Sequence, residues 1–306
     1  MTRAGSLQTE AVKRRLLVGL PTLVLLVLFA APTLIMVLAT FQFPDDFGGL
    51  APAWYSDSDG VHLDLTLENY ERFAGEAIYL KIFWRSLVYA TLTTLFCAAL
   101  AYPLAMFITR APSRIRDLLV LLVILPFWSN FLIRVYAWMS ILGPRSLFTE
   151  GLNGLLGWFG LGPVTLLFTP FAVIVGLVYV HLPFMVLPLY ANLCRHDPAW
   201  LDAARDLGAS PWKTFVGVTL PMSVPGLVAG SLLVFIPALG AFAVPDILGG
   251  AQGAMIGNLI SDQFLSARDW PFGSTIAVAL TLFVVFIAWL MTAVARRLPG
   301  GAAHAR

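Results

Sequence analysis

Between two long apolar runs lies the polar stretch Asp197-Pro-Ala-Trp-Leu-Asp-Ala-Ala-Arg-Asp-Leu-Gly208-Ala-Ser210-Pro-Trp-Lys213. It contains two helix-start signals, because Asp197 and Ser210 can each cap a helix and each precedes a proline, which fits the first helical position. Gly208 follows the first short helix, where a left-handed residue commonly ends a helix. The stretch predicts a helix, a glycine break and a second helix in a loop that closes at Leu220-Pro221. This shape suits docking into a cleft on another protein.

The composition is that of a membrane protein. Of 306 residues, 59% are hydrophobic and 12% are charged, and the mean hydropathy is +0.83, whereas a soluble protein is about 45–50% apolar and about 25% charged. Six apolar runs reach the roughly 20 residues that a helix needs to cross a bilayer, and the alternation of barrel strands is missing. We predict an all-α, polytopic membrane protein with six transmembrane helices. The runs are Leu16–Phe41, Ser86–Thr109, Leu118–Leu142, Thr165–Leu193, Met222–Leu248 and Ser274–Ala295.

The basic residues are sorted by membrane side. The two tails and the loops after the second and fourth runs hold 13 of the 19 Lys and Arg residues, the other loops hold five, and Arg134 lies inside the third run. The positive-inside rule then places both termini and the polar loop in the cytoplasm. The expected order is a cytoplasmic tail (1–15), a transmembrane domain (16–295) and a second cytoplasmic tail (296–306), with an external loop at 42–85 and the polar cytoplasmic loop at 195–221.

Two connecting segments carry local signals. The external loop is acidic, and Leu67-Glu-Asn-Tyr70 with Phe73 predicts a short surface helix in it. This loop is either a solvated connection or a surface that meets a periplasmic partner or attracts cations. The segment Gly143–Pro163 is rich in glycine and leucine, and we expect it to form a loop near the membrane interface.

Motifs of nucleotide-hydrolysing and metal-dependent enzymes are missing from the sequence. The chain has no Gly-Lys pair and therefore no G-x-x-x-x-G-K-[ST] loop, and it has neither H-E-x-x-H nor C-x-x-C. We expect no enzymatic activity, no cofactor and no metal site. If ATP drives transport, a separate chain must hydrolyse it.

Two ionisable residues stand at membrane depth, where charge is costly and commonly functional. Asp246 follows a proline at the external end of the fifth run, where its carboxylate either receives a cationic substrate or is simply solvated. Arg134 is expected to pair with an acidic residue or to lie near an interface. The rings of Trp128, Tyr136 and Trp138 either bind an amine through cation–π contacts or form an interfacial belt.

Further stretches resemble one family. They are Tyr102–Ala105, Leu125–Trp138, Leu182–Pro188, Leu233–Gly240, Pro245–Gly250, Ile256–Asn258 and Gln263–Gly273. With the polar loop, they make the chain similar to the permease subunit of spermidine/putrescine ABC importers, within the inner-membrane components of binding-protein-dependent importers. The polar loop resembles the Glu-Ala-Ala loop of such permeases, with Asp202 where glutamate is usual.

This resemblance implies a MetI-like permease fold whose polar loop docks on a cytoplasmic ATPase. The implied docking residues are Asp202, Ala203, Ala204 and Gly208, flanked by Leu207, Trp212 and Lys213. The implied assembly in the bacterial inner membrane holds this chain, a second related permease, an ATPase homodimer and a periplasmic polyamine-binding protein. Membrane lipid surrounds it, and nucleic acid has no part in it.

Two alternatives remain at this stage. The same architecture can carry another cargo, such as ferric iron, an opine-type amine or an organophosphonate. The chain can instead be a self-sufficient secondary carrier or a structural membrane protein, although that hypothesis leaves the two-helix polar loop unexplained.

Overall fold

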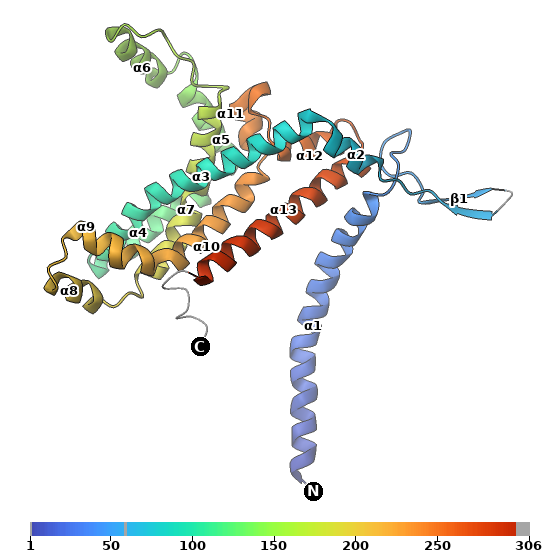
Figure 1. Ribbon diagram of the computed structural model, residues 1–306, viewed down its shortest axis with the longest axis horizontal. Coiled ribbons are helices and arrows are strands. Elements are labelled where there is room, and N and C mark those ends of the chain that lie inside the picture. The colour runs from blue at the N-terminus through green and yellow to red at the C-terminus, as the bar shows by residue number, and fades with distance from the viewer. Residues whose placement is uncertain (1, 58–59, 298–306) are drawn as a thin grey trace. The chain divides into compact units, whose positions relative to one another are not determined.

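A computed structural model describes residues 2–57 and 60–297, which are mostly helical (Figure 1). The chain forms two compact units. The first contains Met1–Glu76 and Asp262–Ala279, and the second contains Ala77–Ser261 and Leu280–Arg306.

The first unit combines a long apolar helix with a small polar assembly. Helix α1 (Thr2–Ala39) contains an apolar segment long enough to span a membrane, Pro21–Ala39. Strands β1 (Trp54–Asp57) and β2 (Gly60–Leu63) then pair as an antiparallel hairpin that the sequence did not predict. The short helix expected in this segment is present as α2 (Glu68–Gly75).

Polar contacts hold the first unit together. The Asn69 amide of α2 donates to the Thr40 and Gln42 carbonyls, at 3.1 Å each. The Arg72 guanidinium lies 3.0 Å from the Asp269 carboxylate. The other Asp269 oxygen accepts from the Phe272 N–H at 3.1 Å and so caps the start of α13 (Trp270–Arg297).

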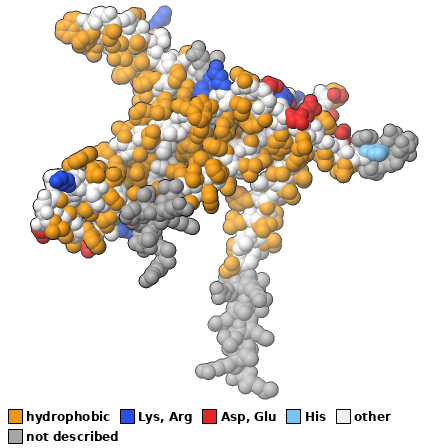
Figure 2. Space-filling model, in the orientation of Figure 1, with side chains coloured by type: hydrophobic (Ala, Val, Ile, Leu, Met, Phe, Trp, Pro, Cys, Tyr) orange, Lys and Arg blue, Asp and Glu red, His pale blue; other side chains and the backbone are white. Residues whose placement is uncertain are grey.

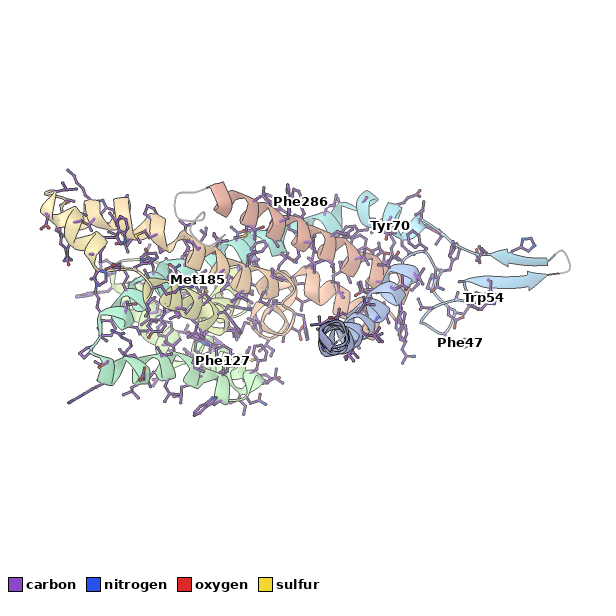
Figure 3. The ribbon with its side chains drawn as sticks, turned by 90° about the horizontal axis from the view of Figure 1, so that it is seen from below. Phe47, Trp54, Tyr70, Phe127, Met185 and Phe286 are labelled. Atoms are coloured by element: carbon purple, nitrogen blue, oxygen red, sulfur yellow. The ribbon has the colours of Figure 1, made fainter. Side chains whose placement is uncertain are left out.

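Three helices form the centre of the second unit. Helices α3 (Ala77–Arg110), α7 (Pro170–Leu193) and α10 (Leu220–Leu239) pack against one another. Met185 of α7 is fully buried in their core and lies within the bundle in Figure 3. A Cβ on Gly226 of α10 would lie 2.5 Å from the Asn192 Cβ, and one on Gly230 would lie 2.7 Å from the Met185 sulfur. These glycines therefore allow α10 to approach α7 closely.

The predicted third span is broken rather than continuous. It consists of α4 (Ser113–Ile124), the 3-10 turn η1 (Leu125–Trp128) and α5 (Phe131–Leu142). The segments Ser113–Trp128 and Phe131–Trp158 are bent by 91° relative to each other. The Asn130 side chain causes a new helix start there, because its Oδ1 accepts from the Leu132 N–H at 2.8 Å. The part of the chain that the structure describes thus has five helices long and apolar enough to cross a membrane, or six if the bent pair forms one span. The six predicted spans agree with the second count.

Other segments also differ from the prediction. The region expected as the loop Gly143–Pro163 contains the helix α6 (Leu147–Trp158). The predicted fifth span is displaced, since its helix begins at Pro211 and ends at Leu239. Asp246 lies in a separate helix, α11 (Ala243–Gly253), which α12 (Ile256–Leu265) follows.

The turn between α11 and α12 is fastened to the start of α3. The Arg85 guanidinium donates to the Ala254 carbonyl, and Ser86 Oγ accepts from the Ile256 N–H at 2.7 Å. The Asn258 amide reaches back to the Phe242 carbonyl at 2.9 Å. Gly257 packs so tightly that an added Cβ would lie 2.6 Å from the Ala241 carbonyl oxygen.

We therefore expect Gly257→Ala to destabilise this unit by about 1–3 kcal/mol, because backbone must move to admit the methyl group. The thermal unfolding midpoint of the purified protein in detergent should fall. Gly154→Ala in α6 is the control, since nothing lies within 4 Å of the methyl position there. Equal midpoints for the two variants would contradict the packing described at Gly257.

Candidate functional site

The polar loop forms two short helices joined at a sharp turn. Helix α8 (Ala199–Asp206) ends before Gly208, whose φ is +80°, as predicted for a left-handed residue. The Gly208 N–H donates to the Arg205 carbonyl at 2.8 Å, and the Ala209 N–H donates to the Ala204 carbonyl at 3.0 Å. These two bonds are those of a Schellman motif, which fixes the direction of the chain after α8.

The second short helix begins as predicted. Ser210 is the N-cap of α9 (Pro211–Thr214), and its Oγ accepts from the Lys213 N–H at 3.4 Å. At the first helix, Asp197 Oδ1 accepts from the Ala199 N–H at 3.0 Å, and the helix begins one residue later than predicted. We call residues 197–214 the elbow. A π-helical turn, η2 (Phe215–Thr219), connects the elbow to α10 without a break in the helix.

The elbow exposes large apolar side chains beside its charged ones. Trp200 is 62% exposed, Leu207 is 89% exposed and Trp212 is 72% exposed. Charged side chains also gather at the α8–α9 end (Figure 2). Such exposed apolar groups on a polar surface are typical of a site that meets another protein.

All the residues implied to dock on an ATPase lie on the elbow. Asp202 forms an exposed ion pair with Arg205 at 3.2 Å, which contributes little to stability. Ala204 is half-buried, and the other docking residues are exposed. The docking residues are Asp202, Ala203, Ala204, Leu207, Gly208, Trp212 and Lys213.

His196 fastens the elbow to α10, a role that the sequence analysis missed. Its Nε2 lies 3.1 Å from the Met222 carbonyl oxygen, so this nitrogen carries the proton. Burial lowers the pKa of His196, the bond to the Met222 carbonyl opposes that effect, and the charge of Arg195 adds to the lowering. A lone histidine in a polar loop gives no sequence signal of such a contact.

The candidate path residues have different surroundings. Asp246 is exposed in the first turn of α11, which packs against α5, and it has no ion-pair partner among the described residues. Tyr136 of α5 is 53% exposed and Trp128 is 74% exposed. Trp138 instead packs edge-on against Tyr179 of α7, with ring centroids 5.5 Å apart. Asp246, Trp128 and Tyr136 are therefore open to a solute or a partner, whereas Trp138 is part of the packing.

Arg134 does not pair with an acidic residue among those described. Its guanidinium lies over the Phe127 ring, 5.7 Å from the centroid, and its buried Nε has no hydrogen-bond partner. Phe127, labelled in Figure 3, packs edge-on against Phe184. No cluster of three or more metal-ligating side chains occurs within residues 2–57 and 60–297.

Comparison with known families gives a direct match. The model of the family described as "Binding-protein-dependent transport system inner membrane component" matches residues 101–299. The chain belongs to this family. The family predicted from the sequence is confirmed, and the inner membrane component is a transport protein that crosses the membrane several times.

Curated members of the family are similar over most of the chain. The spermidine/putrescine transport system permease protein PotB of Salmonella typhimurium (strain SL1344) is 46% identical over 74% of this chain and 78% of its own length. PotB of Escherichia coli (strain K12) is 45% identical over 74% of this chain and 81% of its length. YdcU, an inner membrane ABC transporter permease of the same strain, is 33% identical over 77% of this chain and 76% of its length.

Solved structures of the same fold support the architecture. A chain of a bacterial ABC transporter that imports the polysaccharide alginate has a TM-score of 0.71 at 18% identity and covers 95% of this chain and 98% of its own. A chain of the MetNI methionine ABC transporter has a TM-score of 0.53 at 20% identity and covers 71% of this chain and 94% of its own. These TM-scores establish a shared fold, which confirms the predicted all-α permease fold.

The burial of His196 should make stability depend on pH. Because the pKa of His196 is lowered in the folded protein, the unfolded chain binds a proton first as the pH falls. Stability is therefore full above the unfolded pKa of about 6.5 and decreases below it. As the pH is lowered from about 7.5 to about 5.5, the thermal midpoint should fall less in His196→Gln than in the unaltered protein. His62→Gln should keep the original pH dependence, and an unchanged dependence in His196→Gln would contradict this assignment.

Proposed function

We propose that this chain is the permease subunit of an ATP-driven polyamine importer. The observation that supports this most directly is the elbow, a rigid two-helix projection with exposed apolar side chains that continues without a break into α10. An element of this shape is suited to receive a push from another protein. The cargo is inferred from the curated PotB relatives, whose names specify spermidine and putrescine.

In this proposal, a separate ATPase homodimer supplies the energy. The ATPase cleft receives α8, because the small side chains of Ala203 and Ala204 allow close approach. Leu207 and Trp212 fill apolar pockets beside it, and Gly208 sets the angle between α8 and α9. ATP-driven closure of the ATPase then displaces the elbow, and with it the first turn of α10.

The transport path lies between this chain and a second related permease. A periplasmic polyamine-binding protein delivers the cargo, and both termini and the elbow face the cytoplasm. Asp246 is exposed and unpaired among the described residues, so its carboxylate can meet a cationic amine. The exposed rings of Trp128 and Tyr136 can add cation–π contacts.

Replacing Gly208 tests the docking role. A valine at φ +80° is strained by about 1–3 kcal/mol, although nothing lies within 4 Å of its Cβ position. Uptake of labelled putrescine and spermidine by cells should fall roughly tenfold or more in Gly208→Val, with membrane insertion intact. Gly160→Val is the matched control, because Gly160 also has a positive φ, +72°, and open space around it. Normal uptake by Gly208→Val would exclude the docking role.

Asp246→Asn tests the path. The change keeps the size of the side chain and removes its charge, so polyamine uptake should weaken while polyamine-stimulated ATP hydrolysis by the complex persists. Asp64→Asn, at an exposed position in the predicted external loop, should transport normally. Competition by several amines, ferric iron and phosphonates in the same assay tests the cargo. Uptake equal to that of the unaltered protein in Asp246→Asn would show that this carboxylate is only solvated.

A further inference from the structure

A series of side-chain contacts leads from the elbow into the buried core. Trp212 of the elbow stacks on Phe215 of η2, with ring centroids 5.6 Å apart and planes inclined by 28°. Phe215 meets Tyr102 of α3 edge-on, with centroids 5.3 Å apart. The Tyr102 hydroxyl lies 2.7 Å from Ser223 Oγ of α10. The contacts thus run from a solvent-exposed ring to a buried hydrogen bond between two membrane-spanning helices.

The direction of that hydrogen bond follows from its neighbour. Ser223 Oγ donates its proton to the Leu220 carbonyl at 2.8 Å. The Tyr102 hydroxyl must therefore be the donor to Ser223 Oγ, since a serine hydroxyl has one proton to give. Both side chains are buried, so water cannot readily replace a lost partner, and breaking this bond is costly.

Proline loosens both helices at this level. Pro103 follows Tyr102 within α3, where it removes one backbone donor. In the other helix, Pro221 lacks the N–H that would bond to the Gly217 carbonyl, and its ring crowds that carbonyl. The helix widens in response, and the Leu220 N–H donates to the Phe215 carbonyl five residues earlier. The π-helical turn η2 is thus a local consequence of Pro221.

A π-helical turn departs from ordinary α-helical geometry. It holds one more residue than an α-helical turn, so its conversion to α-helix would rotate the elbow by about 100° relative to α10. Thr214, directly before η2, has a buried hydroxyl with no hydrogen-bond partner among the described residues. Such an unsatisfied group costs free energy in this arrangement.

We propose that Tyr102 is a positioning residue that couples the elbow to α3 through η2. The proposal rests on the proposed docking of the elbow on an ATPase. Displacement of the elbow moves α10 directly, because the helix is continuous, but α3 has no backbone connection to it. Tyr102 of α3 links the two helices through its side chain instead. Its ring contacts Phe215 in the turn, and its hydroxyl is hydrogen-bonded to Ser223 just beyond the turn. Helices α3 and α10 then move together when the ATPase closes.

The test measures the cargo transported per ATP hydrolysed, in vesicles that contain the complete complex with labelled spermidine. Tyr102→Phe removes the hydroxyl and keeps the ring, and Ser223→Ala removes the acceptor. Each variant should lower the cargo transported per ATP about fivefold, the effect of one net hydrogen bond, while ATP hydrolysis continues. The double variant should be no worse than either single one, because both remove the same bond.

Matched controls separate coupling from stability. Tyr89→Phe makes the same change at a buried tyrosine of α3 outside this contact series and should leave the ratio unchanged. The yield of the complex should stay close to that of the unaltered protein in Tyr102→Phe, and the thermal midpoint should fall by only about 2–4 °C, the effect of one net hydrogen bond. An unchanged ratio in Tyr102→Phe, a double variant whose loss is the product of the single losses, or a loss that follows the thermal midpoint would each overturn the proposal. Failure of the proposed function would appear differently, as the absence of ATP-driven uptake in the unaltered complex.

Discussion

The continuity of the helix from Pro211 to Leu239 is the constraint on which the rest of this structure depends. A loop of ordinary flexibility would absorb a push at its surface, whereas a helix transmits it along its axis. The Schellman bonds at Gly208 fix the turn before this helix, and His196 holds the loop to Met222 after it. The elbow is therefore a rigid extension of a membrane-spanning helix.

Glycines and prolines divide the bundle into tight and loose regions. Gly226 and Gly230 place α10 directly against α7, because a Cβ at these positions would lie 2.5 Å from the Asn192 Cβ and 2.7 Å from the Met185 sulfur. Pro221 acts in the opposite way, because it widens the helix at η2 where the elbow joins it. The same bundle thus contains a close contact between two helices and a widened helical turn at its polar end.

Much of this arrangement could be predicted from the sequence, because local rules decide it. Apolar runs define most of the spans, and Gly208 and Ser210 have the turn and capping chemistry that the structure shows. The break at Asn130 was missed because the apolar run continues across it, although the Asn side chain was the available signal. The hairpin at Trp54–Leu63 was missed because its strands are too short to show alternation. The contact of His196 with Met222 joins residues that are distant in sequence, and no local pattern specifies it.

We propose that another chain energises transport and that this chain receives force through the elbow. The most direct measurement is the accumulation of labelled spermidine against its gradient in vesicles that contain the purified chain, with and without the second permease, the ATPase, ATP and the binding protein. We expect accumulation only in vesicles with the complete set. Accumulation by the chain alone would contradict the proposal.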